Sequence, residues 1–229
     1  MLIPEVKRLY PSALVLLWFV LVFLILTQTA KSEEPRRPLK SQTVLVLGDS
    51  LAAGFGVDPE EAFPAVLQRR AEESGLPVRI INGGVSGDTT AGGLRRLDWL
   101  LKTPVDVLFL ELGGNDGLRG LPIESTRSNL TAIIQRTRTR HPKAEIVVAG
   151  MQMPPNVGSD YADRFQALFP EVARGQKASL IPFLLEGVGG IPELNLPDQI
   201  HPTPKGHRMI ASNAWPVLEP LLRRGTTGS

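Results

Sequence analysis

Short apolar runs that end near a glycine alternate with segments of helical spacing from Thr43 to Leu222. Such runs are typical of parallel strands, because a strand that is buried on both faces is apolar along its whole length. The strand-like runs are Thr43–Leu47, Val78–Asn82, Val105–Leu112, Ala144–Ala149 and, more weakly, Ser179–Leu184. The alternation predicts an α/β sandwich around a five-stranded parallel sheet.

The segments between these runs carry apolar residues at helical spacing. The expected helices are Glu60–Ser74, Thr89–Lys102, Ile123–Arg140, Tyr161–Lys177 and Pro204–Leu222. Pro170 lies inside the fourth and is expected to bend or divide it. Pro204 stands in the first turn of the last helix, where proline is tolerated.

The N-terminal region has a different composition. Residues 13–26 are an unbroken apolar run of 14 behind Lys7 and Arg8, typical of a secretory signal peptide and short for a membrane span. The cleavage site after Ala30 is poor, because Gln28 stands where a small residue is preferred. An uncleaved anchor with its basic end in the cytoplasm is the alternative, and a buried core helix fits less well because the run has no polar face.

These features divide the chain into four parts. Residues 1–30 are expected to be the signal peptide or membrane anchor, and the polar, proline-punctuated residues 31–42 a linker. Residues 43–224 are expected to form the folded domain, and residues 225–229 a short tail. Either targeting interpretation sends the domain across a membrane.

Charge and cysteine content exclude several functions. The net charge is +2, and +1 without residues 1–30, which gives no sign of the basic patch that nucleic-acid binding requires. The absence of cysteine excludes disulfides, thiol catalysis and cysteine-based zinc sites. Of the three histidines, His141 ends a helix and His207 lies inside one, so His201 is the best candidate for a base.

Four polar segments stand next to predicted strands or the last helix. They are Gly48–Ser50, Gly84–Thr89, Gly113–Asp116 and Asp198–His201. In open parallel sheets ligands bind outside the carboxyl ends of the strands, so these segments should converge on one crevice. Each alone also has an ordinary interpretation as a turn, a helix cap or a solvated loop.

Together the segments hold the groups that acyl transfer needs. A serine hydroxyl such as that of Ser50 is a weak nucleophile and needs an adjacent base. Asp198, three residues before His201, can hold the orientation and tautomer of that imidazole. Asn115 offers a neutral amide donor to an oxyanion, and the helix start near Gly87 offers backbone N–H groups.

The set resembles the SGNH or GDSL hydrolase family over residues 43–222. The family's first block is matched by GDSLAAG at 48–54, its second-block glycine by Gly87, its GxND block by Gly113–Asp116 and its DxxH block by Asp198–His201. The stretches SGDTTAGGLRRL and ELGGNDGLRG extend the resemblance to the periplasmic branch of acyl-CoA thioesterases, lysophospholipases and arylesterases.

The resemblance implies a flavodoxin-like, three-layer α/β/α fold and a serine hydrolase of carboxylic esters or thioesters. Ser50 would be the nucleophile, His201 the base and Asp198 its orienting carboxylate. The backbone N–H groups of Ser50 and Gly87 and the Asn115 amide would form the oxyanion hole. We expect no cofactor and no metal, a small-molecule or lipid ester substrate, a monomer, and a location in the periplasm or on the inner membrane facing it.

The same resemblance makes residues 117–123 look like a mobile segment beside an acyl groove. Leu118, Leu121 and Ile123 would line an apolar channel for substrate, unless they only cover the edge of the core. Gly84 departs from the family pattern, and we expect it only to loosen the turn.

Three other functions compete with this one. A metal-dependent phosphoesterase would use Asp, Asn and His after the strands, but three histidines are few for such a site. A non-catalytic, membrane-anchored binding domain would keep the fold without turnover, although every group needed for turnover is present. A dinucleotide site at Gly54–Gly56 lacks the third glycine and the acidic residue of that motif.

Overall fold

The computed structural model describes residues 41–154 and 157–227. The predicted signal peptide or anchor at residues 1–30, and the linker up to residue 40, lie outside the described residues. By internal contacts the chain divides into residues 1–38 and residues 39–229, and the second unit is the folded domain described below. No helix within residues 41–154 and 157–227 has both the length and the hydropathy of a membrane span.

The domain is built on a parallel sheet of five strands in the order β2-β1-β3-β4-β5. The strands are β1 (Gln42–Gly48), β2 (Val78–Gly84), β3 (Val107–Glu111), β4 (Glu145–Ala149) and β5 (Ser179–Ile181). This is the flavodoxin-like order, in which the crevice opens between β1 and β3. Gly48 pairs with both Gly84 and Glu111, so the segments that follow β1, β2 and β3 start side by side.

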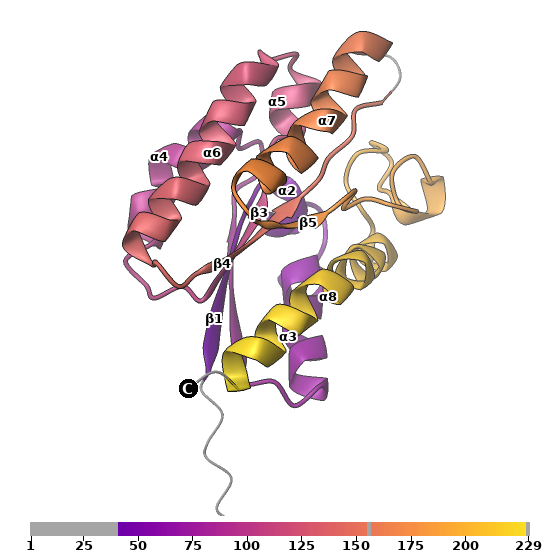
Figure 1. The fold of residues 1–229 in the computed structure, drawn as a ribbon. Helices are drawn as coiled ribbons and strands as arrows, with labels where there is room; N and C mark the ends of the chain where they lie inside the picture. The colour runs from indigo at the N-terminus through magenta and orange to yellow at the C-terminus, as the bar shows by residue number, and fades with distance from the viewer. Residues whose placement is uncertain (1–40, 155–156, 228–229) are drawn as a thin grey trace, which may run out of the picture. The chain divides into compact units, whose positions relative to one another are not determined.

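Helices cover both faces of the sheet (Figure 1). One layer holds α4 (Thr90–Leu100), α6 (Ile123–Arg140) and α7 (Ser159–Gly175), and the other holds α3 (Phe63–Glu73) and α8 (Pro204–Thr227). Short helical turns α2 (Ser50–Ala53), α5 (Gly114–Leu118), η1 (Pro59–Glu61) and η3 (Pro192–Leu194) complete the domain. The predicted three-layer sandwich is confirmed.

Proline has different effects in two of the expected helices. The segment from Glu60 to Ser74 is split into η1 and α3, and Pro64 stands in the first turn of α3, where its missing N–H has no cost. Pro170 lies inside α7 and does not divide it. The buried face of α7, which includes Phe165 and Phe169, packs on the core and outweighs the single lost hydrogen bond.

The core lies between the sheet and the two helical layers. The apolar side chains of β1 from Val44 to Leu47, and those of β3 from Val107 to Leu110, are buried. Each such side chain contributes about 1.5–3 kcal/mol when it leaves water completely. Glu111, at the end of β3, is an acid with no exposed surface.

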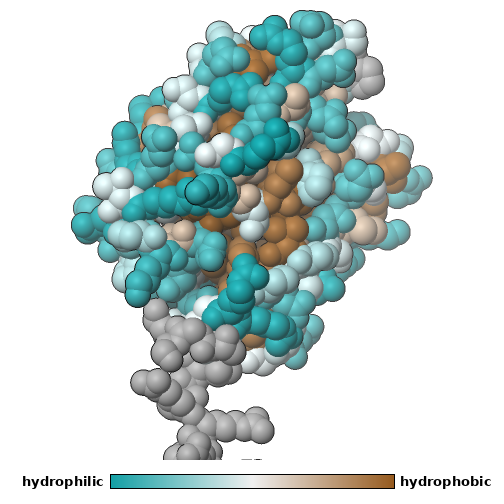
Figure 2. Space-filling view, viewed as in Figure 1, coloured by the Kyte–Doolittle hydropathy of each residue, from teal (hydrophilic) through white to brown (hydrophobic). Residues whose placement is uncertain are grey.

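The face seen in Figure 2 is mostly hydrophilic, with an apolar strip between α7 and α8, where β5 lies. β5 is the last strand of the sheet order and has only three residues. A short edge strand offers few backbone groups to another sheet, which limits association through that edge.

Candidate active site

Ser50 is presented by a tight turn from β1 into α2. Asp49 caps α2, because its Oδ1 accepts a hydrogen bond from the Leu51 backbone N–H at 3.0 Å. As the first helical residue, Ser50 has a backbone N–H that no acceptor inside the helix can reach. The helix ends at Gly54, which has a φ of +75°. The turn therefore holds Ser50 at the carboxyl edge of the sheet.

His201 and Asp198 meet Ser50 there. The Nε2 atom of His201 lies 3.0 Å from Ser50 Oγ, and its Nδ1 atom lies 2.7 Å from Asp198 Oδ2. Hydrogen bonds from the His201 backbone and then from its ring lower the pKa of Asp198 to about 2. An ionised carboxylate only accepts, so in the neutral imidazole Nδ1 carries the proton and Nε2 is free to accept from Ser50.

The loop that carries His201 is folded around the same carboxylate. Asp198 Oδ1 accepts from the backbone N–H groups of Ile200 at 2.9 Å and His201 at 3.0 Å. Gln199, between Asp198 and Ile200, takes a φ of +58°. The Phe55 ring packs on the imidazole, with 4.3 Å between ring centroids. One carboxylate thus fixes both the ring and the backbone that bears it.

The three groups expected to bind an oxyanion have different surroundings. Asn115 lies in the first turn of α5, and its Nδ2 donates to Asp49 Oδ2 at 3.1 Å, which leaves a second N–H for another acceptor. Gly87 lies in the loop after β2 with a φ of +77°, and its carbonyl accepts from Arg119 Nη2 at 2.9 Å. Ser50 and Asn115 line the adjacent cavity, and Gly87 is not among its lining residues.

Arg96 of α4 ties the loop around Gly87 to the ends of two strands. Its guanidinium donates to the carbonyls of Gly48 at 2.9 Å and Gly83 at 2.6 Å. Its Nε pairs with the Asp88 carboxylate at 2.7 Å. Sequence reasoning missed this residue, because nothing in the local pattern separates it from Arg95, the other arginine of the same helix.

Asp116 fixes α5 from behind. Its buried carboxylate accepts from the Thr90 N–H at 2.8 Å, the Thr90 hydroxyl at 2.5 Å and the Thr126 hydroxyl at 3.3 Å. These bonds join α5 to the start of α4 and to α6. The position of Asn115 is therefore set by three helices rather than by one loop.

The structure corrects the expectation that Gly84 only loosens a turn. A Cβ at this position would lie 2.3 Å from the backbone nitrogen of Ala53. The glycine is what allows the end of β2 to approach α2 so closely.

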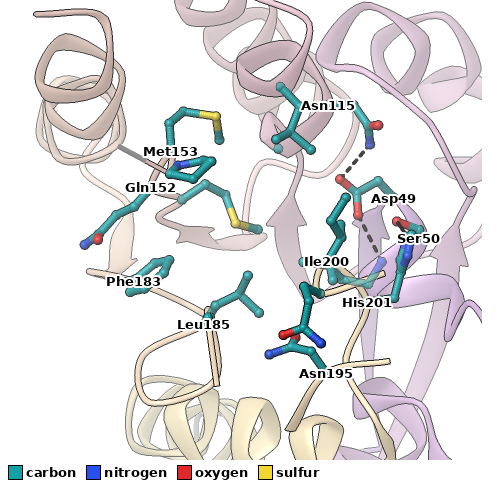
Figure 3. Close-up of a pocket in the computed structure, with 18 residues that line it drawn as sticks. Asp49, Ser50, Asn115, Gln152, Met153, Phe183, Leu185, Asn195, Ile200 and His201 are labelled. Carbon is teal, nitrogen blue, oxygen red and sulfur yellow. Dashed lines mark hydrogen bonds between the residues drawn. The ribbon is translucent and has the colours of Figure 1, made fainter. Parts of the chain in front are cut away.

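A cavity of 480 Å³ opens beside Ser50. Figure 3 shows Ser50 and His201 on one side of it, with Met153, Phe183 and Leu185 on the other. Asp49, Asn115 and Asn195 supply polar groups, while the apolar lining includes Leu118, Met151, Met153, Phe183, Leu185 and Ile200. The cavity therefore has a reactive edge, formed by Ser50 and His201, and a largely apolar wall that includes Met153, Phe183 and Leu185.

The predicted substrate-binding residues fall in different places. Leu118 lines the cavity and is 48% exposed. Leu121 and Ile123 are not among the lining residues. Ile123 is 5% exposed and belongs to the core, and the Leu121 carbonyl accepts from the Tyr161 hydroxyl at 2.8 Å. The cause is that α6 begins at Ile123 and turns that side chain toward the core.

Sequence reasoning missed the apolar wall that the structure shows. Met151 and Met153 follow β4, and Phe183 and Leu185 follow β5. The signal was present, because the rule that locates ligands at the carboxyl ends of strands applies to these two strands as well.

The other histidines are engaged elsewhere. The Nε2 atom of His141 lies 3.1 Å from the Leu101 carbonyl, and Nδ1 of buried His207 accepts from the Phe63 N–H at 3.3 Å. Within the described part of the chain, no three His, Cys, Asp or Glu side chains are grouped so that they could hold a metal ion.

A family model supplies the deciding comparison. The model described as GDSL-like Lipase/Acylhydrolase family matches residues 46–209, which is more than half of the chain and includes all four polar segments. The chain belongs to this family. Because the family consists of lipases and acylhydrolases, this GDSL-like protein is a carboxylic ester hydrolase.

Named relatives agree with the family match. This GDSL-like hydrolase is 40% identical over 203 residues to esterase TesA of Pseudomonas aeruginosa, covering 88% of this chain and 96% of that one. It is 36% identical over 188 residues to thioesterase 1/protease 1/lysophospholipase L1 of Escherichia coli K12, covering 81% and 88%.

Solved structures agree as well. The crystal structure of TesA matches with a TM-score of 0.76 and 41% identity over 79% of this chain and 99% of that one. Psychrotrophic esterase EstA from Pseudoalteromonas sp., inhibited by monoethylphosphonate, matches with a TM-score of 0.75 and 32% identity over 80% and 99%. The predicted SGNH fold is confirmed.

Proposed function

We propose that this GDSL-like hydrolase cleaves carboxylic esters or thioesters through an acyl-enzyme on Ser50. One observation carries the proposal: hydroxyl, imidazole and carboxylate lie in a hydrogen-bonded row, at 3.0 Å from Ser50 to His201 and 2.7 Å from His201 to Asp198. This row borders a cavity that leads away from the hydroxyl. A row of this kind activates a serine for attack on a carbonyl.

Acylation follows from the direction of these hydrogen bonds. Ser50 Oγ attacks the carbonyl carbon while its proton moves to His201 Nε2, and the carbonyl oxygen takes the negative charge. The imidazolium is stabilised by Asp198 on its other nitrogen. His201 then gives the proton to the leaving alcohol or thiol as the bond to the acyl carbon breaks.

Deacylation repeats the sequence with water. His201 takes a proton from water, the resulting hydroxide attacks the acyl carbon, and the proton returns to Ser50 Oγ as the free acid leaves. The Ser50 N–H, the Gly87 N–H and the Asn115 amide are the proposed donors to the oxyanion in both halves. Loss of one such donor typically costs roughly 100- to 1000-fold in turnover.

The wall of the cavity supports an acyl chain as the bound group. Met153, Phe183 and Leu185 lie across the cavity from Ser50. The cavity volume of 480 Å³ is enough for an acyl chain of several carbons. Relatives named esterase, arylesterase and thioesterase/lysophospholipase offer aryl esters, thioesters and lysophospholipids as substrates to compare.

A p-nitrophenyl ester assay tests the proposal with the variants Ser50→Ala and Ser128→Ala. Ser128 is an exposed serine of α6 and serves as the matched control. We expect Ser50→Ala to lose nearly all turnover and all labelling by a fluorophosphonate, and Ser128→Ala to keep both. Unchanged hydrolysis in Ser50→Ala would rule out the assigned nucleophile. Inactivation by EDTA would favour the metal-dependent phosphoesterase instead.

We also propose export, from the sequence of residues 1–30 alone. The basic start and apolar run support a location in the periplasm or on the inner membrane facing it. Cell fractionation of the full chain, before and after carbonate extraction, separates a released protein from an anchored one. Size-exclusion chromatography tests the expected monomer.

A further inference from the structure

Glu111 is a buried acid directly behind the turn that presents Ser50. It is 0% exposed, and its Oε2 accepts from the Asp49 N–H at 3.1 Å. Its Oε1 is buried and has no hydrogen-bond donor among the described residues. A Cβ added to Gly48 would lie 2.3 Å from Oε2, so the carboxyl group is closely packed. A lone charge in such a place is strongly unfavourable.

The side chain next to this carboxyl group is that of Asp49, the residue before the nucleophile. Burial and then the charge of Asp49 raise the pKa of Glu111 well above its usual range. Burial raises the pKa of Asp49 to about 6, against the hydrogen bonds that favour its ionised form. Two buried carboxyl groups that each raise the cost of ionising the other share one proton.

The contacts decide which of the two carries that proton. Asp49 accepts side-chain hydrogen bonds from the Leu51 N–H at 3.0 Å and the Asn115 amide at 3.1 Å, and both favour a carboxylate. It also lines the cavity near His201, whose positive charge during turnover favours an anion. Glu111 has no exposed surface and does not line the cavity, so burial favours its neutral form more strongly than that of Asp49. The proton therefore belongs to Glu111 and the negative charge to Asp49.

Asp49 in turn fixes the Asn115 amide. Figure 3 shows this hydrogen bond at the edge of the cavity. An amide has two N–H groups, and holding one on Asp49 sets the rotation of the other. The row Glu111, Asp49 and Asn115 thus runs from the core of the sheet to the proposed oxyanion hole.

We propose that Glu111, as a neutral carboxylic acid, is a positioning residue that holds Asp49 and, through it, the Asn115 amide for oxyanion binding. The inference rests on the proposed function. Its proton has an electrostatic purpose as well: with both acids ionised, a second negative charge would stand behind the place where the oxyanion forms. One shared proton limits the pair to a single charge, held on the side that faces His201.

Infrared difference spectroscopy tests the proton directly. At pH 7 the wild-type protein should show the C=O stretching band of a protonated carboxylic acid, and Glu111→Gln should lose it. Glu145→Gln, which changes an exposed glutamate of β4, should keep the band. A wild-type spectrum with carboxylate bands alone overturns the inference. So does a band that survives in Glu111→Gln.

Kinetics test the positioning. Glu111→Gln is neutral, can accept from the Asp49 N–H and can donate to its carboxylate, so kcat should stay within about threefold. Glu111→Leu removes both bonds and should lower kcat roughly 10- to 100-fold with KM within about twofold, because an oxyanion donor acts in the transition state. Thermal unfolding of each variant shows that it is folded at the assay temperature.

A double-mutant cycle separates this role from a general loss of structure. If Glu111 acts through Asn115, the two effects should not add. The double variant Glu111→Leu/Asn115→Ala should then have a kcat within about twofold of that of Asn115→Ala alone. The inference would be overturned if the losses in kcat of the two single variants multiplied in the double variant. It would also be overturned if Glu111→Gln lowered kcat as much as Glu111→Leu does. If Glu111→Leu does not fold, the infrared result and Glu111→Gln still decide. Failure of Ser50→Ala to lose activity would overturn the proposed function instead, and leaves the infrared test as it stands.

Discussion

Ser50 Oγ and His201 Nε2 lie 3.0 Å apart although 151 residues separate them in the chain. Each is fixed by its own local structure, Ser50 by the turn from β1 into α2 and His201 by the loop folded around Asp198. Their separation therefore depends on how the start of α8 packs against the sheet. A change at the start of α8 that leaves both local structures intact should alter turnover through the orientation of the imidazole.

The first prediction concerns Asp198→Asn. The Asn side-chain oxygen can still accept from the Ile200 and His201 N–H groups, so the loop should hold. Its amide would face Nδ1 and favour the tautomer with the proton on Nε2, which cannot accept from Ser50. We expect kcat to fall roughly 1000- to 10,000-fold at pH 7. Asp98→Asn, at an exposed position of α4, should keep wild-type turnover, and an Asp198→Asn enzyme within tenfold of wild type would contradict the assignment.

The second prediction concerns Arg96→Gln. The change removes bonds to Gly48, Gly83 and Asp88, and hydrogen bonds to charged groups contribute about 1.5–3 kcal/mol each. We expect kcat to fall roughly 10- to 100-fold and the unfolding temperature to fall by several degrees. Arg95→Gln changes the exposed neighbour and should do neither. Equal effects of the two changes would show that the contacts of Arg96 do not set the site.

The third prediction concerns chain length. Leu185→Trp adds bulk to the cavity wall opposite Ser50. The ratio of kcat/KM for octanoyl over acetyl p-nitrophenyl esters should fall about tenfold or more, since each methylene in an apolar pocket contributes about 1 kcal/mol or more. Leu121→Ala, outside the lining residues, should leave this ratio unchanged. An unchanged ratio in Leu185→Trp would mean that the acyl chain binds elsewhere.

The fourth prediction concerns acid stability. Burial, and then the charge of His201, lowers the pKa of His207 to about 4 from its usual 6.5. Between pH 6.5 and pH 4, His207 therefore binds a proton in the unfolded chain but not in the folded chain. This coupling should remove about 2 kcal/mol of stability between pH 7 and pH 4.5.

Urea unfolding of wild type and His207→Asn measures this effect. The Asn side-chain oxygen can accept from the Phe63 N–H in place of Nδ1. Asp49 and Glu111 have raised pKa values, so they shift stability with pH in the opposite direction, but equally in both proteins. The difference between the two curves isolates His207, and parallel curves would contradict the prediction.

The local sequence pattern predicted the bounds of many helices and strands to within a few residues. The expected helix Ile123–Arg140 and the expected strand Ala144–Ala149 lie where α6 and β4 are found, because spacing and burial in one element are written in neighbouring residues. Pro170 does not divide α7, because its local cost is outweighed by packing with residues far away in the sequence.

The chemical groups near Ser50 were likewise visible in short motifs, whereas the groups that hold them were not. Arg96 and Glu111 look like ordinary charged residues in the sequence. Their roles come from strands and helices that approach them from 48 and 62 residues away. The placement of Ile123 in the core shows the converse, because its motif alone did not reveal which way α6 would face.

The sequence by itself determined the alternation of strands and helices, the resemblance that implies a flavodoxin-like fold, and the residues able to carry acyl transfer. Only the tertiary structure decided which apolar side chains line the cavity, which arginine joins the strand ends and which carboxyl group is buried behind Ser50. The physical reason is the distance along the chain between the residues that interact. Secondary structure and caps depend on residues a few positions apart, but burial, and with it protonation, depends on every segment that packs around a group.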